Sequence, residues 1–305
     1  MQKKIFFIIG TRPEIIKFAP LIKQLEQQKY FKLFICFTGQ HKELLDQTAD
    51  FFSITANVNL QLMQPNQTLS GFFSRSLVAI EEQLIKEKPD LVFVQGDTTS
   101  VLSGAMAAYY QKIPIAHLEA GLRSNDQYNP FPEEMNRVLC SRLTHIHFAP
   151  TDNAVSNLHK EGISDNIYMH GNTVVDSLHL CLKLIKERKE DQFYKFFNNI
   201  DFNKKVVLVT THRRENFGQP LRNILGAIKD FAVKYKDYQI IIPIHPNPQV
   251  KLQVNEELGA LSNILLYGPF SYPQLVWLMS KVYFIVTDSG GIQEEAPSFK
   301  KPILV

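Results

Sequence analysis

VQGDTTSVLSGAMAAYYQKIPIAHLEAGLRSNDQYNPFPEEMNR, residues Val94–Arg137, contains two strand ends that each carry an acidic residue. The apolar run DLVFV leads into Gln95-Gly96-Asp97, and the run IPIAHL leads into Glu119. In an open parallel sheet, ligands bind beyond the carboxyl ends of the strands. We therefore expect Asp97 and Glu119 to face one crevice. A Pro-flanked loop then brings Glu133 and Glu134 to the start of a helix.

These acidic residues have two interpretations. Carboxylates that converge on one site repel one another, which raises some of their pKa values and suits them to proton transfer. Each of them taken alone could instead cap a helix or meet its dipole. Three acidic positions in one compact segment, each beside a Gly or Pro, favour an acid/base site.

Composition narrows the class of protein. The chain has 305 residues, 45% of them hydrophobic, which is enough for two domains with ordinary cores. A net charge of +3 without a block of Lys or Arg argues against nucleic acid and against a membrane surface, so the expected ligand is small. No apolar run approaches membrane-spanning length, and MQKKIFFIIG is too short for a signal peptide. Cys36, Cys140 and Cys181 lack CxxC spacing, which is typical of reduced core thiols in a cytoplasmic protein.

Strand-like and helix-like stretches alternate along the whole chain, from KIFFII to KPILV. The alternation predicts an α/β protein with a first Rossmann-like domain over residues 1–170 and a second over residues 171–305. Each domain is expected to be a doubly wound parallel sheet, with the active site in the interdomain cleft. The charged and aromatic segment KERKEDQFYKFFNN, residues 186–199, is a candidate connection between domains, unless its Phe residues pack on the second domain.

Several turns have the chemistry of phosphate binding. Gly10-Thr11-Arg12-Pro13-Glu14 starts a helix and groups Arg12 with Lys17, although such a basic helix start is also common in solvent. Asp288-Ser289-Gly290-Gly291 can offer backbone N–H groups to a diphosphate and Glu295 can accept from a ribose diol, although Gly pairs also mark ordinary turns. His212 follows a strand beside two arginines, where a ligand contact or a structural role is possible. The chain lacks GxGxxG after its first strand and a P-loop, which argues against a dinucleotide-dependent redox enzyme and a phosphate-hydrolysing NTPase. No cluster of His, Cys or carboxylate residues has metal-ligand spacing.

Nine motifs together resemble a known family. In order and spacing, GTRPEIIKFAP, TGQH, QGDTTS, HLEAGLRS, PEEMNR, GNTVVDSL, THRRENFG, HPNP and DSGGIQEEAP resemble the non-hydrolysing UDP-N-acetylglucosamine 2-epimerases. The resemblance spans essentially the whole chain. It implies a glycosyltransferase-B-like fold and reversible conversion of UDP-GlcNAc to UDP-ManNAc through elimination of UDP, 2-acetamidoglucal and re-addition of UDP. It implies no cofactor, UDP as a further ligand, a homodimer and a role in surface polysaccharide synthesis.

The resemblance also assigns residues to roles. It implies catalytic roles for Asp97, Glu119, Glu133 and His212, with the carboxylates around C2 and C3 of the sugar and the imidazole near the glycosidic oxygen. It implies substrate-binding roles for Arg12, Lys17, Arg137, Phe270, Leu275, Ser289, Gly290, Gly291 and Glu295. A second, activating UDP-GlcNAc would contact Gln40, Arg75, Glu134, Arg213 and His245.

Three functions stay open on sequence alone. The first is this epimerase. The second is a hydrolysing relative that releases free ManNAc, or an epimerase for a modified UDP-sugar. The third is a glycosyltransferase or a non-catalytic UDP-sugar-binding protein. Family members continue past the strand that matches KPILV, whereas this sequence stops at Val305, so we expect the second domain to lack its usual C-terminal end, in a fragment or in a naturally short protein.

Overall fold

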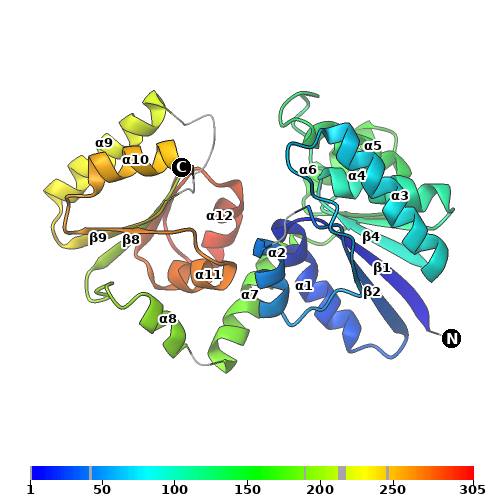
Figure 1. Cartoon of the computed structure of the whole chain (residues 1–305), viewed down its shortest axis with the longest axis horizontal. Coiled ribbons are helices and arrows are strands. Elements are labelled where there is room, and N and C mark those ends of the chain that lie inside the picture. The colour runs from blue at the N-terminus through cyan, green and yellow to red at the C-terminus, as the bar shows by residue number, and fades with distance from the viewer. Residues whose placement is uncertain (1, 41–42, 189, 212–217, 245–246) are drawn as a thin grey trace. The chain divides into compact units, whose positions relative to one another are not determined.

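Two compact units make up the computed structural model, which describes residues 2–40, 43–188, 190–211, 218–244 and 247–305 (Figure 1). The units are Met1–Ser177 and Leu178–Val305, so the division falls within the helix α7, Thr173–Glu187. Each unit contains one parallel sheet with helices between its strands, which confirms the predicted α/β class.

The first unit alternates strands and helices along the chain. Its strands are β1 (Lys3–Ile9), β2 (Phe31–Phe37), β3 (Val58–Asn59), β4 (Leu91–Gln95), β5 (Ile115–Leu118), β6 (Ile146–Ala149) and β7 (Ile167–Met169). Its helices are α1 (Arg12–Glu26), α2 (Glu43–Phe51), α3 (Leu69–Glu87), α4 (Thr99–Tyr110), α5 (Glu133–Leu143), α6 (Asp152–Lys160) and the start of α7.

The first sheet has the strand order β3-β2-β1-β4-β5-β6-β7, so β1 lies at the point where the order reverses. The residues of β1 form a nearly continuous apolar run because helices cover both faces of the sheet at this strand. Phe7 packs on Phe18 of α1 at a ring distance of 5.1 Å, whereas Phe6 and Ile8 join a core with residues of α3 and α4. Figure 1 shows α3 and α4 side by side over this sheet.

Helix starts lie close to the carboxyl ends of the strands in this unit. Gly10 follows β1, and a Cβ there would come within 2.3 Å of Ser100 Oγ in α4. Thr98 caps α4 by accepting a hydrogen bond from the Val101 amide, as N-terminal threonines commonly do. A glycine and a capping threonine therefore bring the ends of β1 and β4 together.

The second unit holds a parallel sheet with the order β10-β9-β8-β11-β12. Its strands are β8 (Lys205–Thr210), β9 (Tyr238–Pro243), β10 (Ile264–Tyr267), β11 (Phe284–Thr287) and β12 (Ile303–Leu304). Besides the rest of α7, its helices are α8 (Asp191–Phe196), α9 (Gln219–Lys234), α10 (Pro248–Leu258), α11 (Tyr272–Lys281), α12 (Gly290–Glu295) and the 3-10 helix η2 (Ala296–Phe299). Apolar residues of α9 and α10 form one core with β8, β9 and β10.

The segment 186–199 belongs to this second unit. It contains α8, and the rings of Phe193 and Phe197 stack on Trp277 of α11 at 5.8 and 5.3 Å. Both phenylalanines are buried, and Trp277 donates a hydrogen bond to Glu190. Of the two sequence interpretations, packing on the second domain is confirmed, because the division between the units falls before this segment, at Ser177 and Leu178.

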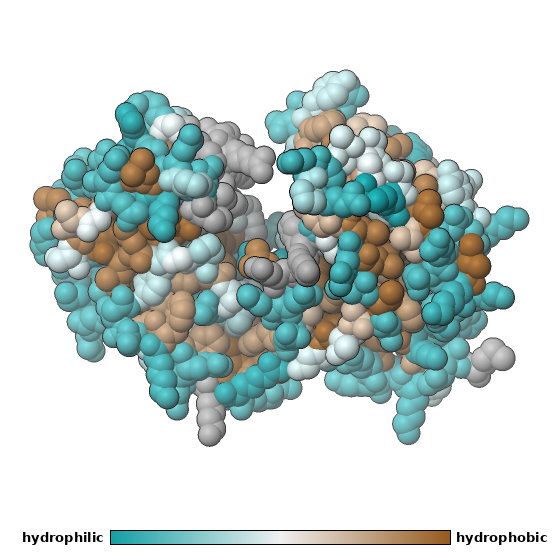
Figure 2. Space-filling view, in the orientation of Figure 1, coloured by the Kyte–Doolittle hydropathy of each residue, from teal (hydrophilic) through white to brown (hydrophobic). Residues whose placement is uncertain are grey.

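The visible face of each unit carries hydrophilic residues together with adjoining apolar ones (Figure 2). Apolar atoms contribute much of the accessible surface of any folded protein. Within the described ranges, no helix is both long and apolar enough to cross a membrane.

Candidate active site

The Glu119 carboxylate, directly after β5, is the most heavily contacted acidic group at the carboxyl edge of the first sheet. Lys17 Nζ lies 2.6 Å from each of its oxygens. Gln95 Nε2 donates to Oε2 at 2.5 Å, and Asn172 Nδ2 donates to Oε1 at 3.0 Å. The Lys17 and Glu119 side chains are only 19% and 10% exposed. One cation and two amides from α1, β4 and the start of α7 therefore fix the direction of this carboxylate.

The backbone at Glu119 is also unusual. Its φ of +70° lies in the left-handed region, which costs a non-glycine residue of order 1–3 kcal/mol and persists only where surrounding contacts hold it. Gly121, at φ +86°, completes the turn, and a Cβ there would lie 2.3 Å from the Ala154 carbonyl oxygen. Strained backbone of this kind clusters at functional sites.

Asp97 follows β4 and is held by residues of α5. Arg137 donates to Asp97 Oδ2 from Nε at 2.9 Å and from Nη2 at 2.6 Å. Asn136 Nδ2 donates to the Asp97 main-chain oxygen at 2.8 Å. Burial raises the pKa of Asp97, Arg137 opposes that rise, and the nearby Glu119 carboxylate adds to it. The two carboxylates predicted at neighbouring strand ends therefore act on each other in one site.

Helix α5 brings two further acidic residues to this edge. Glu134 is buried, and it accepts hydrogen bonds from the Ser124 and Asn125 amides and from Arg137 Nη1, each at 3.0 Å. Burial acts to raise its pKa, but these donors together lower it. Glu133 is half-buried at the first position of α5, and its carboxylate makes no hydrogen bond or ion pair with another residue in the described ranges. Glu133 is thus the acidic group best placed to contact a ligand.

The predicted cationic residues divide between two situations. Lys17 is paired with Glu119 and Arg137 with Asp97, so both cations lie among the catalytic candidates. Arg12 is half-exposed at the first position of α1, where backbone N–H groups lack partners within the helix. The structure therefore brings Lys17, Asp97, Glu119, Glu134 and Arg137 into one network.

Two predicted contacts of a second nucleotide sugar have partners within the first unit. Gln40 accepts a hydrogen bond from Ser100 Oγ at 2.8 Å. Arg75 Nη2 donates to Gln67 Oε1 at 2.6 Å. Glu134, a third member of that set, is held by Arg137 as described above. The other two members, Arg213 and His245, and the catalytic candidate His212 lie outside the described residues.

The predicted residues of the second unit surround the ends of β10 and β11. Ser289 caps α12, and a Cβ added to Gly290 would meet no heavy atom of the described residues within 4 Å, so among them this turn leaves open space. Gly291 is the second residue of α12, and Glu295, at its end, is buried. Phe270 is buried with its ring 5.3 Å from that of Phe197, and Leu275 is half-buried in α11.

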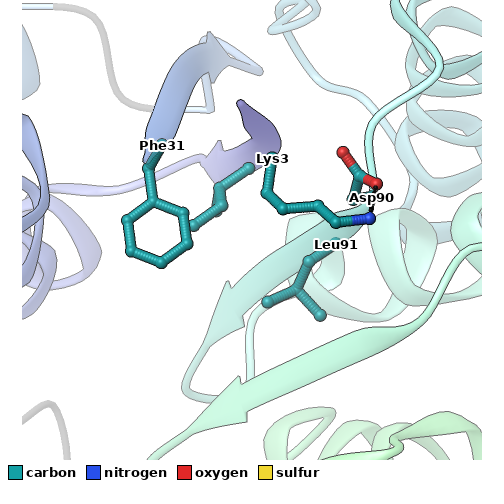
Figure 3. Close-up of a pocket in the computed structure, with 5 residues that line it drawn as sticks. Lys3, Phe31, Asp90 and Leu91 are labelled. Carbon is teal, nitrogen blue, oxygen red and sulfur yellow. Dashed lines mark hydrogen bonds and ion pairs between the residues drawn. The ribbon is translucent and has the colours of Figure 1, made fainter. Parts of the chain in front are cut away.

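Two surface cavities lie at the opposite, amino edge of the first sheet. One, of about 300 Å³, is lined by Lys3, Ile5, Phe31, Asp90 and Leu91, and Lys3 and Asp90 form an ion pair across it at 2.7 Å (Figure 3). The other, of about 400 Å³, is lined by Tyr109, Tyr110, Lys112, Ile113 and His145. Neither contains a predicted site residue.

Four residues of the site were missed from the sequence. Gln95 and Asn172 orient Glu119, Asn136 holds the Asp97 main chain, and Glu14 lies buried beneath the turn that bears Arg12. All four stand in the motifs QGDTTS, GNTVVDSL, PEEMNR and GTRPE. A polar residue directly at a strand end or helix start within such a motif is the sequence feature that could have identified them.

Known proteins resemble this chain over nearly its whole length. A family model described as UDP-N-acetylglucosamine 2-epimerase matches residues 23–305. The UDP-N-acetylglucosamine 2-epimerase of Escherichia coli K12 is 44% identical in an alignment 306 residues long that covers 99% of this chain and 81% of that protein. The UDP-GlcNAc 2-epimerase of Neisseria meningitidis, solved bound to UDP-GlcNAc, is 43% identical with a TM-score of 0.92 and covers 99% of this chain and 82% of its own. The Methanocaldococcus jannaschii enzyme, in complex with UDP-GlcNAc and UDP, is 38% identical with a TM-score of 0.81, over 98% and 83% of the two chains.

Proposed function

This chain belongs to the UDP-N-acetylglucosamine 2-epimerase family, and we propose that it interconverts UDP-GlcNAc and UDP-ManNAc without hydrolysing either. The observation that carries the proposal is the pairing of Glu119 with Lys17 and of Asp97 with Arg137 at neighbouring strand ends. This arrangement offers both the proton-transfer groups and the positive charge that the reaction needs.

The proposed reaction is an elimination followed by an addition. A base removes the C2 proton while the C1–oxygen bond to UDP breaks, which gives 2-acetamidoglucal and free UDP. UDP then adds back to C1, and C2 receives a proton on the opposite face. The C2 proton is weakly acidic, so a positioned base is required, and such acid/base assistance contributes about 10² to 10⁴ in rate.

Three carboxylates are proposed to surround C2 and C3 of the sugar. Glu133 is supported by its lack of a described polar partner, Asp97 by its raised pKa, and Glu119 by its fixed orientation. His212 is proposed to assist near the glycosidic oxygen. No redox cofactor is needed in this route, since neither step is a net oxidation or reduction. The C2–H electron pair becomes the C1=C2 bond while the C1–O pair leaves with UDP, and the addition reverses both changes.

The same proposal assigns substrate contacts. Cationic side chains of Arg12, Lys17 and Arg137 are proposed to stabilise the diphosphate as it leaves, because negative charge develops there. Ser289, Gly290 and Gly291 are proposed to offer N–H groups to the diphosphate, with Glu295 at the ribose and Phe270 and Leu275 near uridine. The open space at Gly290 supports a close approach of a ligand.

Four further features are proposed. A second UDP-GlcNAc would bind Gln40, Arg75, Glu134, Arg213 and His245, and it would compete with the internal hydrogen bonds of the first three. A homodimer is supported by Val78 and Ile85, which lie seven residues apart on α3 and are 54% and 53% exposed. A cytoplasmic location is supported by three free, buried cysteines. The product is proposed to supply surface polysaccharide synthesis.

Product analysis tests the reaction. The chain is incubated with UDP-GlcNAc, and nucleotide sugars and free sugars are separated by anion-exchange chromatography. We expect UDP-ManNAc with no free ManNAc, and we expect Asp97→Asn to lose turnover while it still binds UDP. Asp50→Asn, an exposed aspartate on α2, is the matched control. Free ManNAc released together with UDP would show hydrolysis instead.

A further inference from the structure

Glu14 is a buried carboxyl group that the proposed reaction does not use. It lies in the first turn of α1 and is 1% exposed. Its Oε2 accepts a hydrogen bond from the Gly10 amide at 2.5 Å. Its Oε1 accepts from Thr11 Oγ1 at 3.0 Å and from Thr98 Oγ1 at 2.8 Å. Three donors from two separate turns therefore converge on one side chain.

These donors belong to the ends of neighbouring strands. Gly10 and Thr11 follow β1, and Thr98 follows β4, which pairs with β1 in the sheet. Thr98 Oγ1 also accepts from the Val101 amide at 3.3 Å. Because a hydroxyl has one proton, its lone pairs serve the amide and its proton serves Glu14. The Thr98 hydroxyl is thus fixed by one hydrogen bond that it donates and one that it accepts, and Thr98 directly follows Asp97 in the chain.

Packing alone does not explain an acidic residue here. A buried carboxylate is costly unless it is paired or hydrogen-bonded, and no described residue forms an ion pair with Glu14. Burial raises the pKa of Glu14 to about 7, and the three donors oppose that rise. An apolar side chain would avoid this cost, so the hydrogen bonds themselves are the function of the group.

We propose that Glu14 is a positioning residue that ties the turn after β1 to the turn after β4 and so sets the location of Asp97. Asn136 and Arg137 hold Asp97 from α5, and Glu14 holds the same turn from α1. The inference rests on the proposed function, in which Asp97 exchanges a proton with C2 of the sugar.

Kinetics of Glu14 variants test the proposal. Glu14→Ala removes all three acceptor contacts and is expected to lower kcat by about 100-fold, a loss that a displacement of a catalytic group by about 1 Å can cause. Glu14→Gln keeps an oxygen for the two threonines but turns an amide N–H₂ toward Gly10, so its kcat should lie between those of wild type and Glu14→Ala. Glu26→Gln, in the last turn of the same helix, is the control and should match wild type.

Rates are expressed per UDP-binding site, so that loss of folded protein is not read as loss of positioning. With KM and UDP affinity unchanged, the graded fall in kcat supports the proposal. The proposal is overturned if Glu14→Ala has the wild-type kcat per UDP-binding site. It is equally overturned if the total rate falls only in proportion to the number of UDP-binding sites lost.

Hydrogen exchange of the Val101 amide gives a readout that needs no turnover. Exchange should be faster in Glu14→Ala, intermediate in Glu14→Gln and unchanged in Glu26→Gln, because the Thr98 cap loses its anchor. Unchanged exchange in Glu14→Ala overturns the link between the two turns. If the variants show the expected exchange pattern but the wild-type chain does not epimerise, the proposed function fails while the link stands.

Discussion

Replacing Lys17 with Met removes a cation that contacts both oxygens of Glu119. The Met side chain keeps much of the aliphatic length of Lys, so packing in α1 is largely retained. Gln95 and Asn172 remain as donors, but Glu119 loses its positive partner while it stays 10% exposed. The free energy of unfolding of the first unit should therefore fall.

The size of this loss follows from burial. Removing one partner of a buried ion pair costs about 3–5 kcal/mol, because the other charge stays buried and unpaired. The Lys17 and Glu119 side chains retain 19% and 10% exposure, so we take the lower end of that range. A loss of about 3 kcal/mol corresponds to about a hundredfold change in an opening equilibrium.

Native-state hydrogen exchange measures that change within the first unit. Amides of β4 and β5 should exchange about a hundredfold faster in Lys17→Met than in wild type. Lys23→Met is the control on the same helix, because Lys23 pairs with Glu26 at 28% and 42% exposure and such pairs contribute less than about 1 kcal/mol. In a double-mutant cycle with Glu119→Gln, the coupling should be about 2 kcal/mol or more. Equal effects of Lys17→Met and Lys23→Met, or additive effects in the cycle, would refute the reasoning.

Three further outcomes are expected. Burial lowers the pKa of His117 and of His147 from 6.5 to about 4. Between these pH values the unfolded state binds more protons than the folded state. The stability that these histidines contribute above pH 6.5 is therefore lost as the pH falls toward 4, by up to about 3 kcal/mol for each. Glu14 acts with the opposite sign between pH 4.5 and about 7, and so does Asp97, whose pKa burial also raises. The histidine contribution is therefore measured as a difference, and the change of the urea midpoint on acidification should be less destabilising in His117→Gln than in wild type. The Arg123 side chain is 3% exposed and pairs with Glu161, so Arg123→Met leaves that carboxylate without its cation and should lower the free energy of unfolding in urea by about 3–5 kcal/mol. Lys183 is 72% exposed, so Lys183→Met should change the free energy of unfolding little. Gln95→Ala should lower kcat about tenfold at unchanged KM, because Glu119 loses a donor that orients it; a change confined to KM would show that Gln95 binds substrate instead.

The fold was largely predictable because parallel strands covered on both faces leave a strong local signal. The run KIFFII became β1 for that reason, and the segment Gly10–Glu14 started the helix as expected. The segment 186–199 left two possibilities because its charges suggest a linker and its phenylalanines a core. The stacking of Phe197 on Trp277 decides between them, and Trp277 lies 80 positions later in the sequence, where no local pattern reveals it.

The site was predictable in part. Asp97 and Glu119 could be placed because each ends an apolar run, and strand ends meet at one edge of a parallel sheet. The pairing of Lys17 with Glu119 joins residues 102 positions apart, and no local pattern specifies it. Glu14 was missed because an acidic residue in the first turn of a helix usually faces solvent, whereas this one is buried beneath two turns.

Proton NMR of the wild-type chain with UDP-GlcNAc in D₂O tests the proposed reaction most directly. The C2 proton signal should disappear as deuterium from the solvent replaces it, and UDP-ManNAc should appear at the same time without free sugar. A C2 proton that persists while UDP is bound, or free ManNAc as the product, would contradict epimerisation by elimination and re-addition.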